Sequence, residues 1–154
     1  MANGKGQYRQ NFQREKSEFN QVVLDIARVT RVTAGGKRFS FRATVAIGDG
    51  NGRVGVGVAK GQDVAQSIDK ASKRAKREVI KINLKGGTIP HEVMAKYSSA
   101  VVFMKPSPKG NGVKAGGPVR AIAKLAGIED ISAKLIERTN NKINIARAAV
   151  KALS

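Results

Sequence analysis

The chain has 154 residues, of which 29 are Lys or Arg and 11 are Asp or Glu, so its formal net charge is +18. This surplus predicts a polyanionic partner, because bound phosphates relieve the self-repulsion of the compact state. The lack of cysteine excludes disulfides, cysteine-based zinc sites and thiol nucleophiles, and no apolar run approaches the roughly 18 residues of a membrane span.

The chain begins with a polar stretch that leads into a long strand. Residues 1–17 lack the apolar core of a signal sequence, so we expect a flexible basic arm there. Residues 19–32 are rich in β-branched and aliphatic side chains, which predicts a half-buried strand. Gly35 and Gly36 then break the strand and form a loop whose bare backbone another chain can approach closely.

Two further strands are predicted on either side of a tight turn at residues 49–52. The strand before the turn contains Phe39 and Phe41, which we expect in the core. The strand after it alternates valine with Gly55 and Gly57, so one of its faces is almost bare backbone. This pattern predicts a flat glycine surface that brings Arg and Lys groups against the phosphates of folded RNA.

A helix is predicted to follow, because Asp63 and Gln66 have the spacing of a capping box and apolar residues recur at helical spacing from Val64 to Val79. The other faces of this helix are basic, and the sequence leaves open whether their side chains are merely solvated or contact phosphate. The basic residues are Lys70, Lys73, Arg74, Lys76, Arg77 and Lys81. The first unit therefore has the order β-β-β-α.

The second half of the chain begins after a glycine-containing linker at residues 85–88. The predicted elements are strands at 89–96, 99–104 and 131–136 and helices at 118–126 and 141–153. Residues 106–117 contain too much glycine and proline to be regular, and Asn140 is the expected cap of the last helix. This unit therefore has the order β-β-α-β-α.

No group of residues predicts catalysis. Gly50, Gly52 and Gly55 have the spacing of a dinucleotide-binding loop, but a strand follows them where that loop requires a helix. His91 is the only histidine, and there is no cysteine to complete a metal site with it. We therefore expect no enzyme activity, no catalytic residue, no metal and no cofactor.

The glycine-rich turn and several other motifs resemble the family of small ribosomal subunit protein five. The most specific similarity lies at residues 48–55, which read GDGNGRVG. The other similar motifs are Gly35-Gly36, Phe39-Ser40-Phe41, Val102-Phe103-Met104, Pro106-Ser107, Ala115-Gly116-Gly117 with Arg120, and Thr139-Asn140 with Asn144. The resemblance covers nearly all of the chain after Phe19.

This resemblance implies an α+β fold of two small domains. Residues 1–17 would be the basic arm, and residues 18–84 a β-β-β-α domain similar to a double-stranded-RNA-binding domain. Residues 89–154 would form a β-β-α-β-α domain with a left-handed β-α-β crossover. The implied place of the chain is the cytoplasmic ribosome, away from any membrane.

The resemblance also implies a function and partners. The chain would be a structural constituent of the small ribosomal subunit that binds small-subunit ribosomal RNA and supports subunit assembly and translational accuracy. Its implied neighbours are small-subunit proteins four and eight, with protein three as a further candidate, and messenger RNA near the place where it enters. Two alternatives from the residues alone are a free RNA chaperone or double-stranded-RNA-binding regulator, and a small RNA-modifying enzyme.

Eight residues are expected to contact RNA, with basic side chains supplying phosphate affinity and little base specificity. They are Arg28, Arg31, Gly35, Gly36, Lys37, Arg38, Arg53 and Lys60. By resemblance, residues 28–38 reach the RNA near the spectinomycin site. Gly110, Gly112 and Arg120 resemble the segment that faces protein four, where changes alter accuracy.

Overall fold

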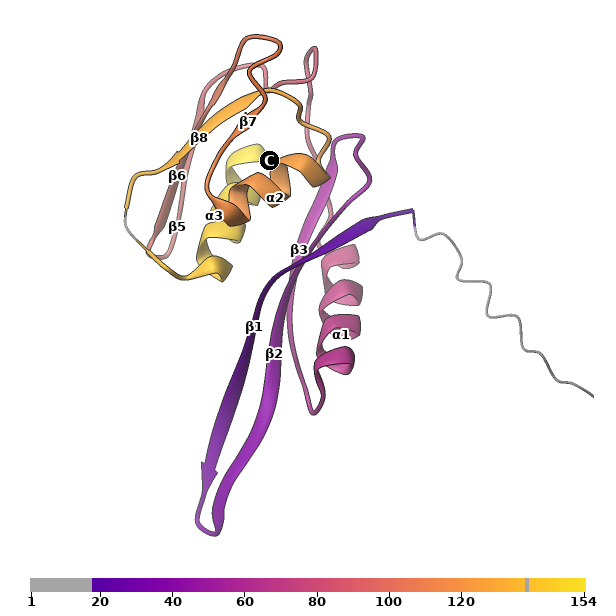
Figure 1. Cartoon of the computed structure of the whole chain (residues 1–154), viewed down its shortest axis with the longest axis vertical. Coiled ribbons are helices and arrows are strands. Elements are labelled where there is room, and N and C mark those ends of the chain that lie inside the picture. Colours follow the sequence, from indigo (N-terminus) through magenta and orange to yellow (C-terminus); the bar gives the residue numbers. More distant parts are fainter. Residues whose placement is uncertain (1–17, 138) are drawn as a thin grey trace, which may run out of the picture.

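The computed structural model describes residues 18–137 and 139–154, which form two small α+β domains (Figure 1). The N-terminal domain contains β1 (Asn20–Thr33), β2 (Gly36–Gly48), β3 (Arg53–Gly61), α1 (Val64–Arg77) and β4 (Ile80–Lys81). The C-terminal domain contains β5 (Val93–Tyr97), β6 (Ala100–Pro106), β7 (Val113–Lys114), α2 (Gly117–Leu125), β8 (Ile131–Leu135) and α3 (Lys142–Leu153). The predicted α+β class is confirmed, whereas the arm predicted at residues 1–17 lies outside the described residues.

β1 and β2 form a hairpin that extends well beyond the rest of the described chain (Figure 1). The strands pair antiparallel, from Asn20 opposite Gly48 at one end to Thr33 opposite Gly36 at the other. Residues 43–48 of β2 are buried, whereas all residues from 31 to 39 are exposed. One half of the hairpin therefore builds the core, and the other half reaches into solvent.

The glycines of β3 lie against α1. A Cβ atom at Gly57 would lie 2.2 Å from the carbonyl oxygen of Ala71, and one at Gly55 would lie 2.5 Å from that of Ala75. Real Cβ atoms do not approach other atoms so closely, so the backbone of α1 can pack here only because β3 has glycine. The prediction that this flat surface meets RNA is wrong, because a helix of the same chain covers it.

Asp63 is the N-cap of α1, as predicted, and its Oδ1 accepts a hydrogen bond from the Val64 N–H at 2.7 Å. Gln66 Oε1 accepts from the N–H of Gln62 instead of the Asp63 N–H that a capping box would use. The apolar side of the helix forms a small core with β2, made of Ala43, Val45, Ile47, Ala71 and Ala75. A short strand that was not predicted, β4, then pairs with the edge of β3.

The C-terminal domain has a four-stranded sheet in the order β5-β6-β8-β7. β7 lies in the glycine- and proline-rich segment expected to be irregular, and its two residues pair with the edge of β8. Because β7 and β8 are parallel and α2 connects them, they form a β-α-β unit whose handedness stays a prediction. The first strand begins at Val93 and not at Ile89, because Ile89 is a buried loop residue of the core.

The cap of α3 also differs from the prediction by one residue. Asn141 Oδ1 accepts hydrogen bonds from the N–H groups of Ile143 at 3.1 Å and Asn144 at 3.4 Å. Asn140, the expected cap, precedes this position and makes no such bond. Adjacent asparagines have the same capping chemistry, so only the backbone conformation decides which of them caps.

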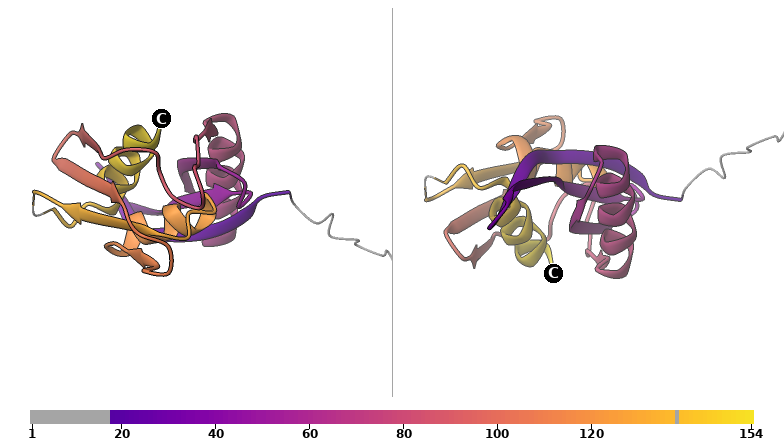
Figure 2. Two further views of the ribbon diagram at one scale, coloured as in Figure 1. Left: turned by 90° about the horizontal axis from the view of Figure 1, so that it is seen from above. Right: turned by 90° about the horizontal axis from the view of Figure 1, so that it is seen from below.

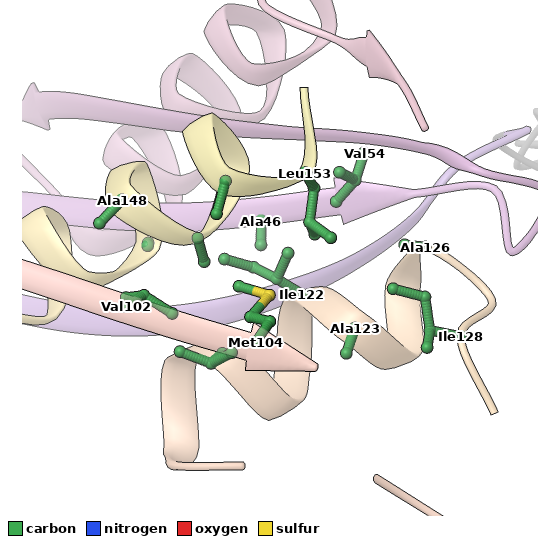
Figure 3. Packing of buried hydrophobic residues seen from close by; sticks show 14 of the residues in the cluster. Ala46, Val54, Val102, Met104, Ile122, Ala123, Ala126, Ile128, Ala148 and Leu153 are labelled. Atoms are coloured by element: carbon green, nitrogen blue, oxygen red, sulfur yellow. The ribbon is translucent and has the colours of Figure 1, made fainter. Parts of the chain in front are cut away.

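The two domains share one hydrophobic core, and the first sheet lies between α1 and the C-terminal domain (Figure 2). Ala46 of β2 and Val54 of β3 gather with Met104 of β6, Ile122 of α2 and Leu153 of α3 (Figure 3). Neighbouring residues of a strand point to opposite faces of the sheet. Ala46 of β2 therefore joins the core between the domains, whereas Val45 and Ile47 join the small core under α1. The domains therefore pack as a single body.

The turn between β2 and β3 caps the end of α2. The N–H of Gly50 donates to the Leu125 carbonyl and that of Gly52 to the Ala126 carbonyl, both at 2.9 Å. The last carbonyls of a helix lack partners within it, so this turn satisfies groups that would otherwise need water. A Cβ atom at Gly127 would lie only 2.0 Å from the Gly50 carbonyl oxygen. The glycine-rich motif thus joins the two domains.

Candidate nucleic-acid interface

Four basic side chains occupy the outer half of the β1–β2 hairpin, and all are exposed: Arg28, Arg31, Lys37 and Arg38. Arg31 stands directly opposite Arg38 in the register of the two strands. Like charges in this position repel each other and destabilise the strand pair. A phosphate group beside them would turn this repulsion into attraction, so the outer half of the hairpin suits a polyanion.

Phe39 is also exposed on this part of the hairpin. The guanidinium carbon of Arg28 lies 4.5 Å from the centroid of the Phe39 ring, within the range of a cation–π contact. Phe39 is 53% exposed and Phe41 is partly buried, so the prediction of a core position is wrong for Phe39. The reason is that the hairpin extends past α1, so the apolar surface that covers the inner half does not reach this ring.

The two glycines at the hairpin tip leave the backbone accessible. A Cβ atom would meet nothing within 4 Å at either Gly35 or Gly36, and Gly36 has a φ of +144° that other residues rarely adopt. The carbonyl oxygen of Gly36 accepts a hydrogen bond from Thr33 Oγ1 at 3.1 Å, which closes the turn. The tip is therefore a narrow, ordered turn between cationic strands.

Arg53 and Lys60 lie away from the tip. In the register of β2 and β3, Lys60 stands opposite Arg42, and Val54 stands opposite Gly48. At ~3.3 Å per residue, these two levels are roughly 20 and roughly 40 Å from the tip. The structure therefore groups four of the predicted cations and separates the other two from them.

Arg53 is already paired within the protein. Its Nε lies 2.6 Å from Asp49 Oδ2, and the Asp49 carboxylate also accepts hydrogen bonds from the N–H groups of Asn51 and Arg53. Burial alone raises the pKa of Asp49, but the hydrogen bonds and the charge of Arg53 outweigh it and hold the pKa below its ordinary value of 3.8. Asp49 in turn raises the pKa of Arg53. This pair stabilises the turn that joins the domains.

A buried carboxylate holds the predicted protein-facing loop. The N–H of Gly112 donates to Asp130 Oδ1 at 2.7 Å, and Asp130 is only 5% exposed. Gly110 and Gly112 both have positive φ, at 94° and 69°. Arg120 is exposed on α2 and lines a hollow of about 380 Å³ beside the β2–β3 turn. Sequence reasoning missed Asp130, because only the fold brings it to a loop 18 residues earlier.

The described residues offer cations, backbone donors and an exposed ring to a ligand. Among residues 18–137 and 139–154, no group of three or more His, Cys, Asp or Glu side chains could hold a metal ion. Over the same ranges, no helix has the length and apolar character to cross a membrane. What the hairpin can do chemically is bind phosphate through charge and stack Phe39 against a planar group.

The fold and the hairpin define a class: a basic two-domain α+β protein that presents cations to a polyanion. The family described as ribosomal protein S5, N-terminal domain, matches residues 19–83, and ribosomal protein S5, C-terminal domain, matches residues 95–154. The small ribosomal subunit protein uS5 of Persephonella marina is 51% identical over 133 residues, which make up 86% of this chain and 69% of that relative. The chain belongs to the ribosomal protein S5 family, as its motifs predicted.

Proposed function

We propose that this chain, a structural component of the small ribosomal subunit, binds small-subunit ribosomal RNA through the outer half of the β1–β2 hairpin. The observation that supports this is the group of exposed cations Arg28, Arg31, Lys37 and Arg38 on strands that extend beyond the folded body. A narrow hairpin can enter folded RNA where the body of a domain cannot. Its contacts hold neighbouring RNA segments together by their phosphates and so support subunit assembly.

The other residues predicted to contact RNA contribute to binding to different extents in this proposal. Gly35 and Gly36 let the tip backbone approach the RNA closely. Lys60 extends the contact along the same sheet. Arg53 contributes least, because Asp49 already neutralises it.

The test removes the two cations that face each other. Arg31→Ala with Arg38→Ala is expected to lower the slope of log affinity against log salt by about 1.5–2 units for transcribed small-subunit ribosomal RNA. A matched control, Lys124→Ala with Lys134→Ala, removes two exposed cations of the C-terminal domain and should leave the slope unchanged. If the hairpin variant keeps the wild-type slope, the hairpin is not the RNA-binding element.

We further propose that the C-terminal domain contacts small-subunit proteins four and eight, with protein three as a further candidate, near the place where messenger RNA enters. Gly110, Gly112 and Arg120 would face protein four and influence accuracy, a role that the family resemblance supports. Arg120→Ala is then expected to raise stop-codon readthrough in a reporter assay, whereas Lys134→Ala on β8, outside the hollow that Arg120 lines, should not. Equal readthrough in both variants would remove Arg120 from this interface.

A further inference from the structure

We propose a second phosphate-binding surface, which runs along α1 into the cleft between the two domains and binds one RNA strand. This inference rests on the proposed RNA-binding function, shares Lys60 with it and uses none of the hairpin residues 28–38. We call the surface the α1 channel. Its basic residues are Lys60, Lys70, Lys73, Arg74, Arg77, Arg147 and Lys151.

The channel consists of three neighbouring hollows. The first, of about 340 Å³, lies between Lys60 and Lys70, and the second, of about 510 Å³, lies along α1 from Lys70 to Arg77. Lys70 lines both of them. The third hollow, of about 580 Å³, lies between the domains and shares Arg74 and Glu78 with the second. Because neighbouring hollows share lining residues, they lie next to one another along α1.

Four cations of α1 lie on the face of the helix that borders the channel. Lys70, Lys73, Arg74 and Arg77 have the spacing i, i+3, i+4 and i+7, which puts them on one face of α1 over about 10 Å. Ala71 and Ala75 form the opposite, fully buried side. A row of cations at this spacing is suited to successive phosphates of one strand.

Two cations of the C-terminal domain continue the row. Arg147 and Lys151 lie one turn apart on α3, and both line the cleft between the domains together with Arg74. Arg147 Nη1 donates to the Tyr97 hydroxyl at 2.6 Å, which orients the guanidinium but uses only one of its five donors. The cleft therefore offers cations from both domains to a single ligand.

The acidic groups along the channel oppose this binding only weakly. Among residues 18–137 and 139–154, Glu78 is the only acidic residue that lines any of the three hollows, and its Oε1 lies 3.4 Å from Arg74 Nε. The side chains of this pair are 49% and 59% exposed, so the ion pair is solvated and easily exchanged for a phosphate. An RNA strand is favoured over a small anion, because a small anion would neutralise only one point of the channel.

The test measures the salt dependence of binding to transcribed small-subunit ribosomal RNA. Lys70→Ala, Lys73→Ala and Arg77→Ala together are expected to lower the slope by about 2–3 units. The control removes three exposed lysines outside the channel: Lys76→Ala, Lys81→Ala and Lys85→Ala. Its slope should stay at the wild-type value, and thermal unfolding checks that both variants are folded.

A second variant tests the part of the channel between the domains. Arg147→Gln with Lys151→Ala is expected to lower the slope by about 1.5–2 units, because it removes two cations. The α1 channel is refuted if its variants keep the wild-type slope or lose no more than the control. Loss in the hairpin variant alone would leave the proposed function standing and overturn only this inference. Loss in the channel variants alone would support the channel and refute the hairpin assignment.

Discussion

Gly57→Ala offers the sharpest test of the packing between β3 and α1. The added Cβ would lie 2.2 Å from the Ala71 carbonyl oxygen and 2.5 Å from the Ala75 nitrogen. An ordinary contact begins at 3.4 Å, so the helix would have to move away by about 1.2 Å. Both obstacles are backbone atoms of α1, and neither can rotate aside. Such a movement also loosens the packing of Ala71 and Ala75, which are fully buried.

Overpacking of this kind costs up to about 3 kcal/mol, and we expect Gly57→Ala to reach that value because backbone and not side chain must move. For a chain of this length, the loss corresponds to a fall in Tm of roughly 6–12 °C. The measurement is thermal unfolding followed by circular dichroism, with Gly35→Ala as the matched control. A Cβ at Gly35 meets nothing within 4 Å, so its Tm should stay the same or rise slightly. If Gly57→Ala unfolds at the wild-type temperature, the glycine face does not hold α1.

Two further predictions concern a helix cap and the Asp49 carboxylate. Asn141→Ala should lower the free energy of unfolding in urea by about 0.5–2 kcal/mol, whereas Asn140→Ala should change it by less than about 0.5 kcal/mol; equal losses would refute the assigned cap. Asp49→Ala removes hydrogen bonds to the backbone and to Arg53, so we expect a loss of about 1–3 kcal/mol at pH 7. Because the pKa of Asp49 is lowered in the folded state, this stabilisation is complete above the unfolded pKa near 4 and disappears as the pH falls through the folded value. A difference between wild type and variant that does not shrink at all as the pH is lowered from 4 into the acid range would contradict this role.

The sequence determined the broad outline of the fold because that outline depends on local patterns. β-Branched residues in β1, the glycine turn before β3 and the helical spacing of α1 each specify an element without help from distant residues. Sequence patterns did not predict the shortest strands, because these depend on distant residues. β4 and β7 have two residues each and form only where the edge of another strand supplies hydrogen-bond partners.

The sequence likewise predicted some features of the candidate RNA site and not others. The net charge of +18 predicted a polyanionic partner, and the hairpin cations follow from the sequence around Gly35 and Gly36. The sequence could not show that Arg53 is paired with Asp49 or that Phe39 is exposed. The Arg53–Asp49 pair depends on the backbone conformation of the turn. The exposure of Phe39 depends on where the other elements end, which no local pattern specifies.

The α1 channel depends still more on tertiary structure. Its cations come from β3, α1 and α3, and Arg74 and Arg147 are separated by more than 70 positions in the sequence. The sequence by itself determined the charge, the main elements and the family of the protein, because composition, periodicity and motifs are properties of the chain. Only the tertiary structure decided that the glycines of β3 receive a helix and that the cations of two domains line one channel, because burial and proximity arise when distant segments pack together.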